Sequence, residues 1–91
     1  MKRDNIFKKA KELVNGDRAK EYGSAYENHK RIAEIWSVIL GKQITVSQVY
    51  QCMIGVKLSR LIETPDHTDS WVDICGYSSL GGEKHEKRWS F

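Results

Sequence analysis

Residues 44–62, with the sequence ITVSQVYQCMIGVKLSRLI, form the most apolar stretch of the chain and decide its fold. Thr45 and Gln48 near its start have the spacing of a capping box, in which each side chain bonds the backbone N–H of the other residue. The apolar positions after them recur at helical spacing: Val49, Met53, Ile54, Val56, Leu58 and Leu61. We therefore predict a helix over about 46–62 at the centre of the core.

Two further helices are predicted before this one. Residues 4–14 carry an apolar stripe with spacings of three and four residues, and Gly16 fits the end of that helix. Ser24 and Glu27 also have capping-box spacing, and the helix that they begin runs to the residue before Gly41. The first stripe is Ile6, Phe7, Ala10, Leu13 and Val14, and the apolar side of the second helix is Ile32, Ile35, Trp36 and Ile39.

The last helix is predicted over about 69–80. Pro65 breaks the chain before it, Asp66 or Thr68 is expected to cap it, and the glycines at 81–82 are expected to end it. Its apolar side chains are Trp71, Val72, Ile74, Cys75 and Leu80. No segment alternates like a β-strand, so four helices with short connections predict an all-α, antiparallel four-helix bundle.

The length of 91 residues fits a single domain, with a core over about 4–82 and a basic tail over 83–91. A chain of this size buries only about two-thirds of the surface that its unfolded state exposes. Its core is therefore thin, and helix faces that stay uncovered could bury against a second copy. We expect a homo-oligomer.

Three features of the sequence bear on where the protein is located and on which partners it binds. No apolar run approaches the roughly 20 residues of a membrane span, and residues 1–4 precede a charged segment instead of the apolar run of a signal peptide. Cys52 and Cys75 lie far apart in apolar stretches, which predicts buried thiols and no zinc or redox motif. The net charge of +3 is small for a nucleic-acid binder. We predict a cytoplasmic protein without a membrane or nucleic-acid partner.

Asp69 and Asp73 are the main candidates for chemistry, because carboxylates four residues apart point to one face of a helix. Such ligands suit Mg²⁺, which takes one or two protein carboxylates and completes its shell with waters and phosphates. The alternative is structural, with Asp69 complementing the dipole of its helix. Asp73 would then pair with Lys57 or Arg60. His67, close by, could bind phosphate or carry a proton, or be simply exposed.

Glu27, Arg31 and Glu34 form a charged side on the second predicted helix. The pair Glu27–Arg31, four residues apart, is typical of a solvated helix face. We therefore expect this side of the helix to face solvent.

Two stretches, 22–33 (YGSAYENHKRIA) and 67–77 (HTDSWVDICGY), resemble the hallmark segments of a family of short phage and prophage proteins. The resemblance extends over about residues 14–82, and Lys57 and Arg60 fall where that family tends to be basic. It implies a domain of unknown function, so it supplies no activity by itself.

More distantly, the helix layout is similar to that of MazG-type all-α nucleoside triphosphate pyrophosphatases. This resemblance implies Mg²⁺ held by an E-x-x-E pair and a later E-x-x-D pair on two helices, in a dimer or tetramer. Asp73 would match the last acid, and Glu27 would match one acid of the first pair. The chain has Lys30 and Ser70 at two positions where the pattern has an acid. Asp69 lies one residue before Ser70.

Three functions are open at this point. The first is Mg²⁺-dependent cleavage of a nucleoside triphosphate between its α- and β-phosphates. Its metal ligands would be Asp69, Asp73 and Glu27, and its phosphate ligands would be Lys57, Arg60, Arg31 and His67. The second is nucleotide binding without turnover, in which Tyr22, Tyr26 or Trp71 stacks on the base. The third is binding of a host protein through an exposed helix face, aided by Trp89 and Phe91.

Overall fold

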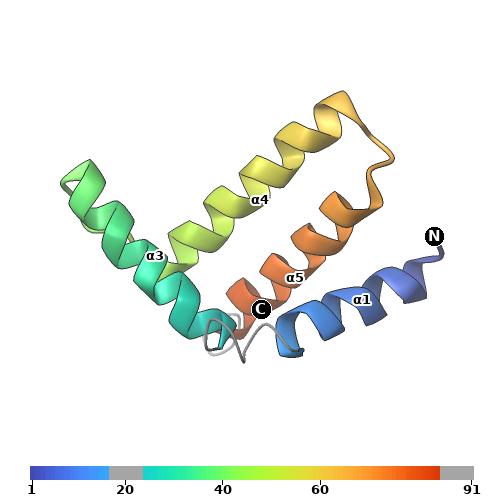
Figure 1. Ribbon diagram of the computed structural model, residues 1–91, viewed down its shortest axis with the longest axis horizontal. Coiled ribbons are helices and arrows are strands. Elements are labelled where there is room, and N and C mark those ends of the chain that lie inside the picture. The colour runs from blue at the N-terminus through green and yellow to red at the C-terminus, as the bar shows by residue number, and fades with distance from the viewer. Residues whose placement is uncertain (17–23, 85–91) are drawn as a thin grey trace, which may run out of the picture.

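The computed structural model describes residues 1–16 and 24–84, with only the backbone at position 84. These residues form four α-helices and no β-strand: α1 (Arg3–Asn15), α3 (Ala25–Leu40), α4 (Val46–Glu63) and α5 (Thr68–Lys84) (Figure 1). The all-α prediction is confirmed, and each of the four predicted helices is present, although the last one is longer than predicted.

Local signals explain where the helices begin and end. Thr45 Oγ1 accepts the Gln48 N–H at 3.1 Å, and Gln48 Oε1 accepts the Thr45 N–H at 2.9 Å, which completes the predicted capping box of α4. Ser24 Oγ accepts the Glu27 N–H at 3.1 Å at the start of α3. Gly41 ends α3 with a φ of 67°, a left-handed conformation that favours glycine.

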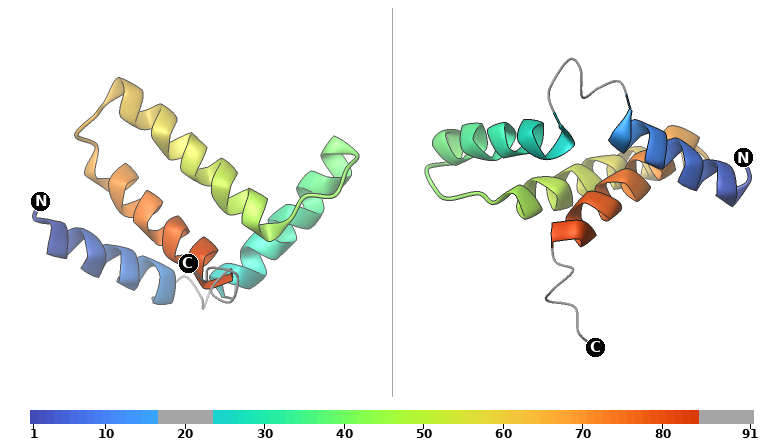
Figure 2. Two further views of the ribbon diagram at one scale, coloured as in Figure 1. Left: turned by 180° about the vertical axis from the view of Figure 1, so that it is seen from behind. Right: turned by 90° about the horizontal axis from the view of Figure 1, so that it is seen from below.

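Helices α4, α5 and α1 pack as neighbours, with α5 between the other two (Figures 1 and 2). The chain reverses at residues 64–67, so that α5 returns alongside α4. Gly76 lets α1 approach α5 closely, since a Cβ there would lie 3.3 Å from Val14 Cγ2. The buried apolar residues of the described chain are Ala10, Ala33, Val49, Tyr50, Leu61, Val72 and Leu80.

Helix α3 is arranged differently, because it meets the other helices mainly at one end. After Gly41 the chain turns back along α3, where the Ser37 hydroxyl donates to the Ala33 carbonyl at 2.7 Å and accepts the Ile44 N–H at 2.9 Å. Helices α3 and α4 then diverge like the limbs of a V (Figures 1 and 2). Closure of all four helices into an antiparallel bundle therefore stays a prediction.

This open arrangement exposes side chains that the sequence pattern assigned to the core. On α3, Ile35 and Ile39 are 57% and 71% exposed, because the helix packs through the side that carries Ala33. On α4, Val56 and Leu58 are 44% and 50% exposed. Phe7 and Trp71, from the apolar sides of their helices, are exposed as well. The thiol of Cys52, which was predicted to be buried, is exposed, whereas Cys75 is half-buried. These predictions were wrong because periodicity identifies an apolar face without showing what covers it.

The prediction that Gly81 and Gly82 end the last helix is also wrong, since α5 continues to Lys84. A glycine inside a helix costs about 1 kcal/mol relative to alanine, which tertiary packing can offset. A Cβ at position 81 would lie 3.9 Å from Tyr50 Cδ2, so this stretch of α5 lies close to α4. None of the helices in the described ranges is long and apolar enough to cross a membrane. Tyr22, Trp89 and Phe91 lie outside the described residues.

Candidate functional site

Lys57 of α4 and Asp73 of α5 form an ion pair. Lys57 Nζ lies 3.1 Å from Asp73 Oδ2, and the two side chains are 11% and 25% exposed. Partial burial lowers the effective dielectric constant and strengthens the attraction relative to a pair in open water. The expectation that Asp73 pairs with Lys57 or Arg60 is therefore confirmed, with Lys57 as the partner.

Arg60 and Asp69 each lie about one helical turn from this pair, toward the connection between α4 and α5. The helical rise places Arg60 about 4.5 Å along α4 from Lys57, and Asp69 about 6 Å along α5 from Asp73. Both are exposed. Arg60 in the last turn of α4 and Asp69 in the first turn of α5 also complement their helix dipoles. Two cations of α4 and two carboxylates of α5 thus lie within about one turn of each other along the halves of these helices that are next to their connection.

The connection beside these charges is held by hydrogen bonds. His67 Nδ1 lies 2.7 Å from the Oγ of Ser70, a side chain with no solvent exposure. The Trp71 indole N–H donates to the Pro65 carbonyl at 3.0 Å. The His67 backbone N–H donates to the Thr64 carbonyl at 3.0 Å. These bonds fix the position of α5 relative to the end of α4.

His67 itself occupies the position just before α5. Because the helix begins at Thr68, the capping position is His67, and the prediction of Asp66 or Thr68 as the cap is wrong. The imidazole is half-buried and oriented by Ser70. A role of His67 in phosphate binding stays a prediction.

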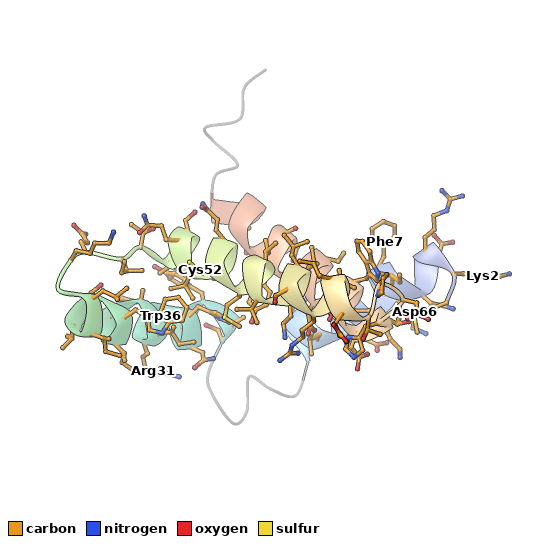
Figure 3. All side chains as sticks on the ribbon, turned by 90° about the horizontal axis from the view of Figure 1, so that it is seen from above. Lys2, Phe7, Arg31, Trp36, Cys52 and Asp66 are labelled. Carbon is orange, nitrogen blue, oxygen red and sulfur yellow. The ribbon has the colours of Figure 1, made fainter. Side chains whose placement is uncertain are left out.

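Glu27 and Arg31 lie elsewhere, on exposed positions of α3. Figure 3 shows Arg31 far from Asp66, which lies in the connection between α4 and α5. In residues 1–16 and 24–83, no three His, Cys, Asp or Glu side chains are grouped so as to hold a metal ion. The predicted set of Glu27, Asp69 and Asp73 is therefore not assembled within the described part of one chain.

An aromatic cluster that sequence reasoning missed joins α3, α4 and α5. The ring centroid of His29 lies 5.1 Å from that of Tyr50 and 5.4 Å from that of Tyr77, and the two tyrosine rings are 6.3 Å apart. His29 Nδ1 lies 2.6 Å from the Ala25 carbonyl oxygen, so Nδ1 carries a proton, because a carbonyl only accepts. His29 and Tyr77 belong to the two stretches, 22–33 and 67–77, that resemble the phage family. This resemblance was the signal in the sequence that could have pointed to the cluster.

Two phage proteins are similar to this chain over most of its length. The "Gene 55 protein" of Mycobacterium phage L5 is 42% identical over 77 residues, which cover 84% of this chain and 49% of the phage protein. The "Gene 55 protein" of Mycobacterium phage D29 is 39% identical over 75 residues, which cover 82% of this chain and 50% of that protein. The chain thus spans about half the length of these curated relatives. No solved structure matches it.

The chain belongs to the family described as Domain of unknown function (DUF6378), which matches residues 5–85. The predicted membership in an uncharacterised phage family is therefore confirmed. The resemblance to MazG-type pyrophosphatases rests on the helix layout and acid spacing, and it stays a prediction.

Proposed function

We propose that this protein binds the phosphate groups of a nucleotide at the connected ends of α4 and α5, and that it cleaves a nucleoside triphosphate there with Mg²⁺. The observation that supports the proposal is the Lys57–Asp73 ion pair, with Arg60 and Asp69 one turn away toward the same end. Phosphate binding needs cations, and Mg²⁺ needs one or two carboxylates next to the phosphates. This group of side chains contains both.

Each residue has a definite role in the proposal. Lys57 and Arg60 neutralise phosphate charge, Lys57 as a point charge and Arg60 through its planar donors. Asp69 and Asp73 fit the small number of protein ligands that Mg²⁺ takes. A Mg²⁺ ion held by Asp69 and Asp73 would supply activation of water and stabilisation of the leaving pyrophosphate. The roles of Glu27 as a metal ligand and of Arg31 as a phosphate ligand are supported by the sequence alone.

A second candidate, nucleotide binding without turnover, is favoured by the same ion pair. The ammonium group of Lys57 already neutralises Asp73, so a metal ion would have to compete with it for this carboxylate. Binding of a nucleotide through Lys57 and Arg60 needs no metal. Such a protein would sequester a nucleotide and leave it intact.

The experiment for the catalytic form is a chromatographic screen of ribo-, deoxyribo- and cyclic nucleotides with Mg²⁺, Mn²⁺ or EDTA. Water attack at the α-phosphorus breaks the bond to the β-phosphate, so a triphosphate and water give a monophosphate and pyrophosphate. Asp73→Asn should abolish this metal-dependent turnover. The matched control is Glu12→Gln, which removes an exposed acid from α1, away from the connection between α4 and α5, and should leave turnover unchanged. Full activity of Asp73→Asn contradicts the assignment.

Calorimetric titration separates the second candidate from the first. If no nucleotide is cleaved, a nucleotide that binds in EDTA, with affinity reduced at least about 10-fold by Lys57→Met, supports binding without turnover. Lys42→Met, at an exposed position after α3, should not change the affinity. Absence of both cleavage and binding contradicts both candidates.

A further inference from the structure

The charged side chains beside the connection between α4 and α5 balance one another. We call this set the charge cluster: Lys57, Arg60, Asp69 and Asp73. Lys57 and Asp73 neutralise each other in their 3.1 Å ion pair. Within the described part of the chain, Arg60 and Asp69 form no ion pair, and both are exposed. Two positive and two negative charges cancel, so the cluster as a whole is neutral before a ligand binds.

A free phosphate anion gains little from this neutral cluster. An anion that approaches Lys57 also approaches the Asp73 carboxylate, so attraction and repulsion offset each other. If Lys57 leaves Asp73 to follow the anion, a carboxylate that is only 25% exposed loses its partner, which is costly. Asp69 places a second negative charge about one and a half turns of α5 away from Asp73 or less. Like charges held next to each other disfavour such a ligand.

A ligand that carries both signs of charge avoids this cost. In a polyphosphate bound to a divalent cation, Asp73 can exchange the Lys57 ammonium for the cation, because carboxylate oxygens are among the ligands that Mg²⁺ takes. Lys57 then donates to the phosphate oxygens, which its flexible four-carbon chain allows. Each member of the ion pair thus keeps a partner of opposite sign, and neither charge is left alone at a partly buried position.

We propose that the Lys57–Asp73 ion pair is an autoinhibitory contact, in which Asp73 excludes free phosphate anions from the site. This inference rests on the proposed function, because it concerns phosphate binding at the same side chains. Asp73 is the specificity-determining residue, since it competes with a free anion for the ammonium group of Lys57. In Asp73→Asn this competitor is neutral, Lys57 is released, and the charge cluster has a net positive charge. That variant should therefore accept the anion that the wild type excludes.

The test is calorimetric titration of the full-length chain with inorganic pyrophosphate, once in EDTA and once with excess Mg²⁺. The wild type should bind the magnesium complex at least about 10-fold more tightly than the free anion. Asp73→Asn should bind the free anion at least about 10-fold more tightly than the wild type does, and it should bind the magnesium complex more weakly. The matched control, Glu12→Gln, removes an exposed acid of α1 and should change neither dissociation constant more than about 2-fold.

Helical circular dichroism checks that each variant is folded, and the comparison of the two forms of pyrophosphate on the wild type needs no variant. A wild type that binds the free anion as tightly as the magnesium complex overturns the autoinhibition but leaves phosphate binding at this site in place. A folded Asp73→Asn that binds the free anion no more tightly than the wild type overturns the role of Asp73. If the wild type and Asp73→Asn bind neither form, the proposed function fails, and this inference fails with it.

Discussion

The ammonium nitrogen of Lys57 and the carboxylate oxygen of Asp73 meet at 3.1 Å between α4 and α5, with 11% and 25% of their side chains exposed. This contact joins two helices, so it contributes to the fold as well as to the candidate site. Removing one partner of a buried pair leaves an uncompensated charge, which costs more than the intact pair contributes. The two roles can therefore be separated by measuring stability and nucleotide binding on the same variants.

The first prediction concerns the stability of this pair. Lys57→Met and Asp73→Asn should each lower the free energy of unfolding by about 1–3 kcal/mol, because each leaves a partly buried charge without its partner. The double variant should lose at least about 0.5 kcal/mol less than the sum of the two single losses, which urea unfolding measures. Lys42→Met serves as the control and should stay within about 0.5 kcal/mol of the wild type. Additive losses would show that the contact makes no energetic contribution.

The second prediction compares one substitution at two helical glycines. Nothing lies within 4 Å of a Cβ added at Gly55, so Gly55→Ala should stabilise the protein by about 0.5–1 kcal/mol. A Cβ at Gly76 would lie 3.3 Å from Val14 Cγ2, so in Gly76→Ala the Val14 side chain must shift by a few tenths of an ångström. It should be at least about 1 kcal/mol less stable than Gly55→Ala.

Urea unfolding of the two variants and of Val14→Ala tests this contrast. In the Val14→Ala background the contact is gone, and Gly76→Ala should then be stabilising. Equal effects at the two glycines in the wild-type background would contradict the close packing of α1 on α5.

The helices could be located from the sequence because their signals are local. The capping pair Thr45–Gln48 and the cap Ser24 act within three residues, and the apolar period spans two or three turns. The exposure of Ile39 could not be predicted in the same way, because it depends on where α4 lies. A tertiary arrangement decides whether an apolar stripe becomes core or surface.

The contacts of the candidate site could likewise be predicted only in part from the sequence. Asp73 could be assigned a cationic partner, but Lys57 and Arg60 are one turn apart on α4. Only the alignment of α4 with α5 selects Lys57. The cluster of His29 with Tyr50 and Tyr77 depends on three helices that meet in space, so no local pattern contains it.

The third prediction concerns the connection between α4 and α5. Ser70 is fully buried, and its hydroxyl lies 2.7 Å from His67 Nδ1. Ser70→Ala should lower the free energy of unfolding by about 1–2 kcal/mol, because it leaves the half-buried imidazole nitrogen without this partner. Ser59→Ala, at an exposed position of α4, should change it by less than about 0.5 kcal/mol. If thermal and urea unfolding show that Ser70→Ala has the same free energy of unfolding as Ser59→Ala, this hydrogen bond does not stabilise the connection.

The last prediction follows from the burial of Tyr50. Burial raises the pKa of its phenol above the ordinary value, and electrostatic interactions with Tyr26 and Glu83 add to the shift. The unfolded chain therefore releases this proton first as the pH rises. The contribution of Tyr50 to stability is complete below the unfolded pKa of about 10 and is lost as the pH rises through the higher pKa of the folded state.

Urea unfolding from about pH 8 to about pH 11 tests this sign. The free energy of unfolding of the wild type should fall more steeply above about pH 10 than that of Tyr50→Phe, which has no phenol proton to release at this position. Below about pH 9 the difference between the two proteins should be constant, because Tyr50 is then protonated in both states. If the two curves stay parallel up to about pH 11, the pKa of Tyr50 is not raised, and the packing of Tyr50 at the meeting point of α3, α4 and α5 is looser than described.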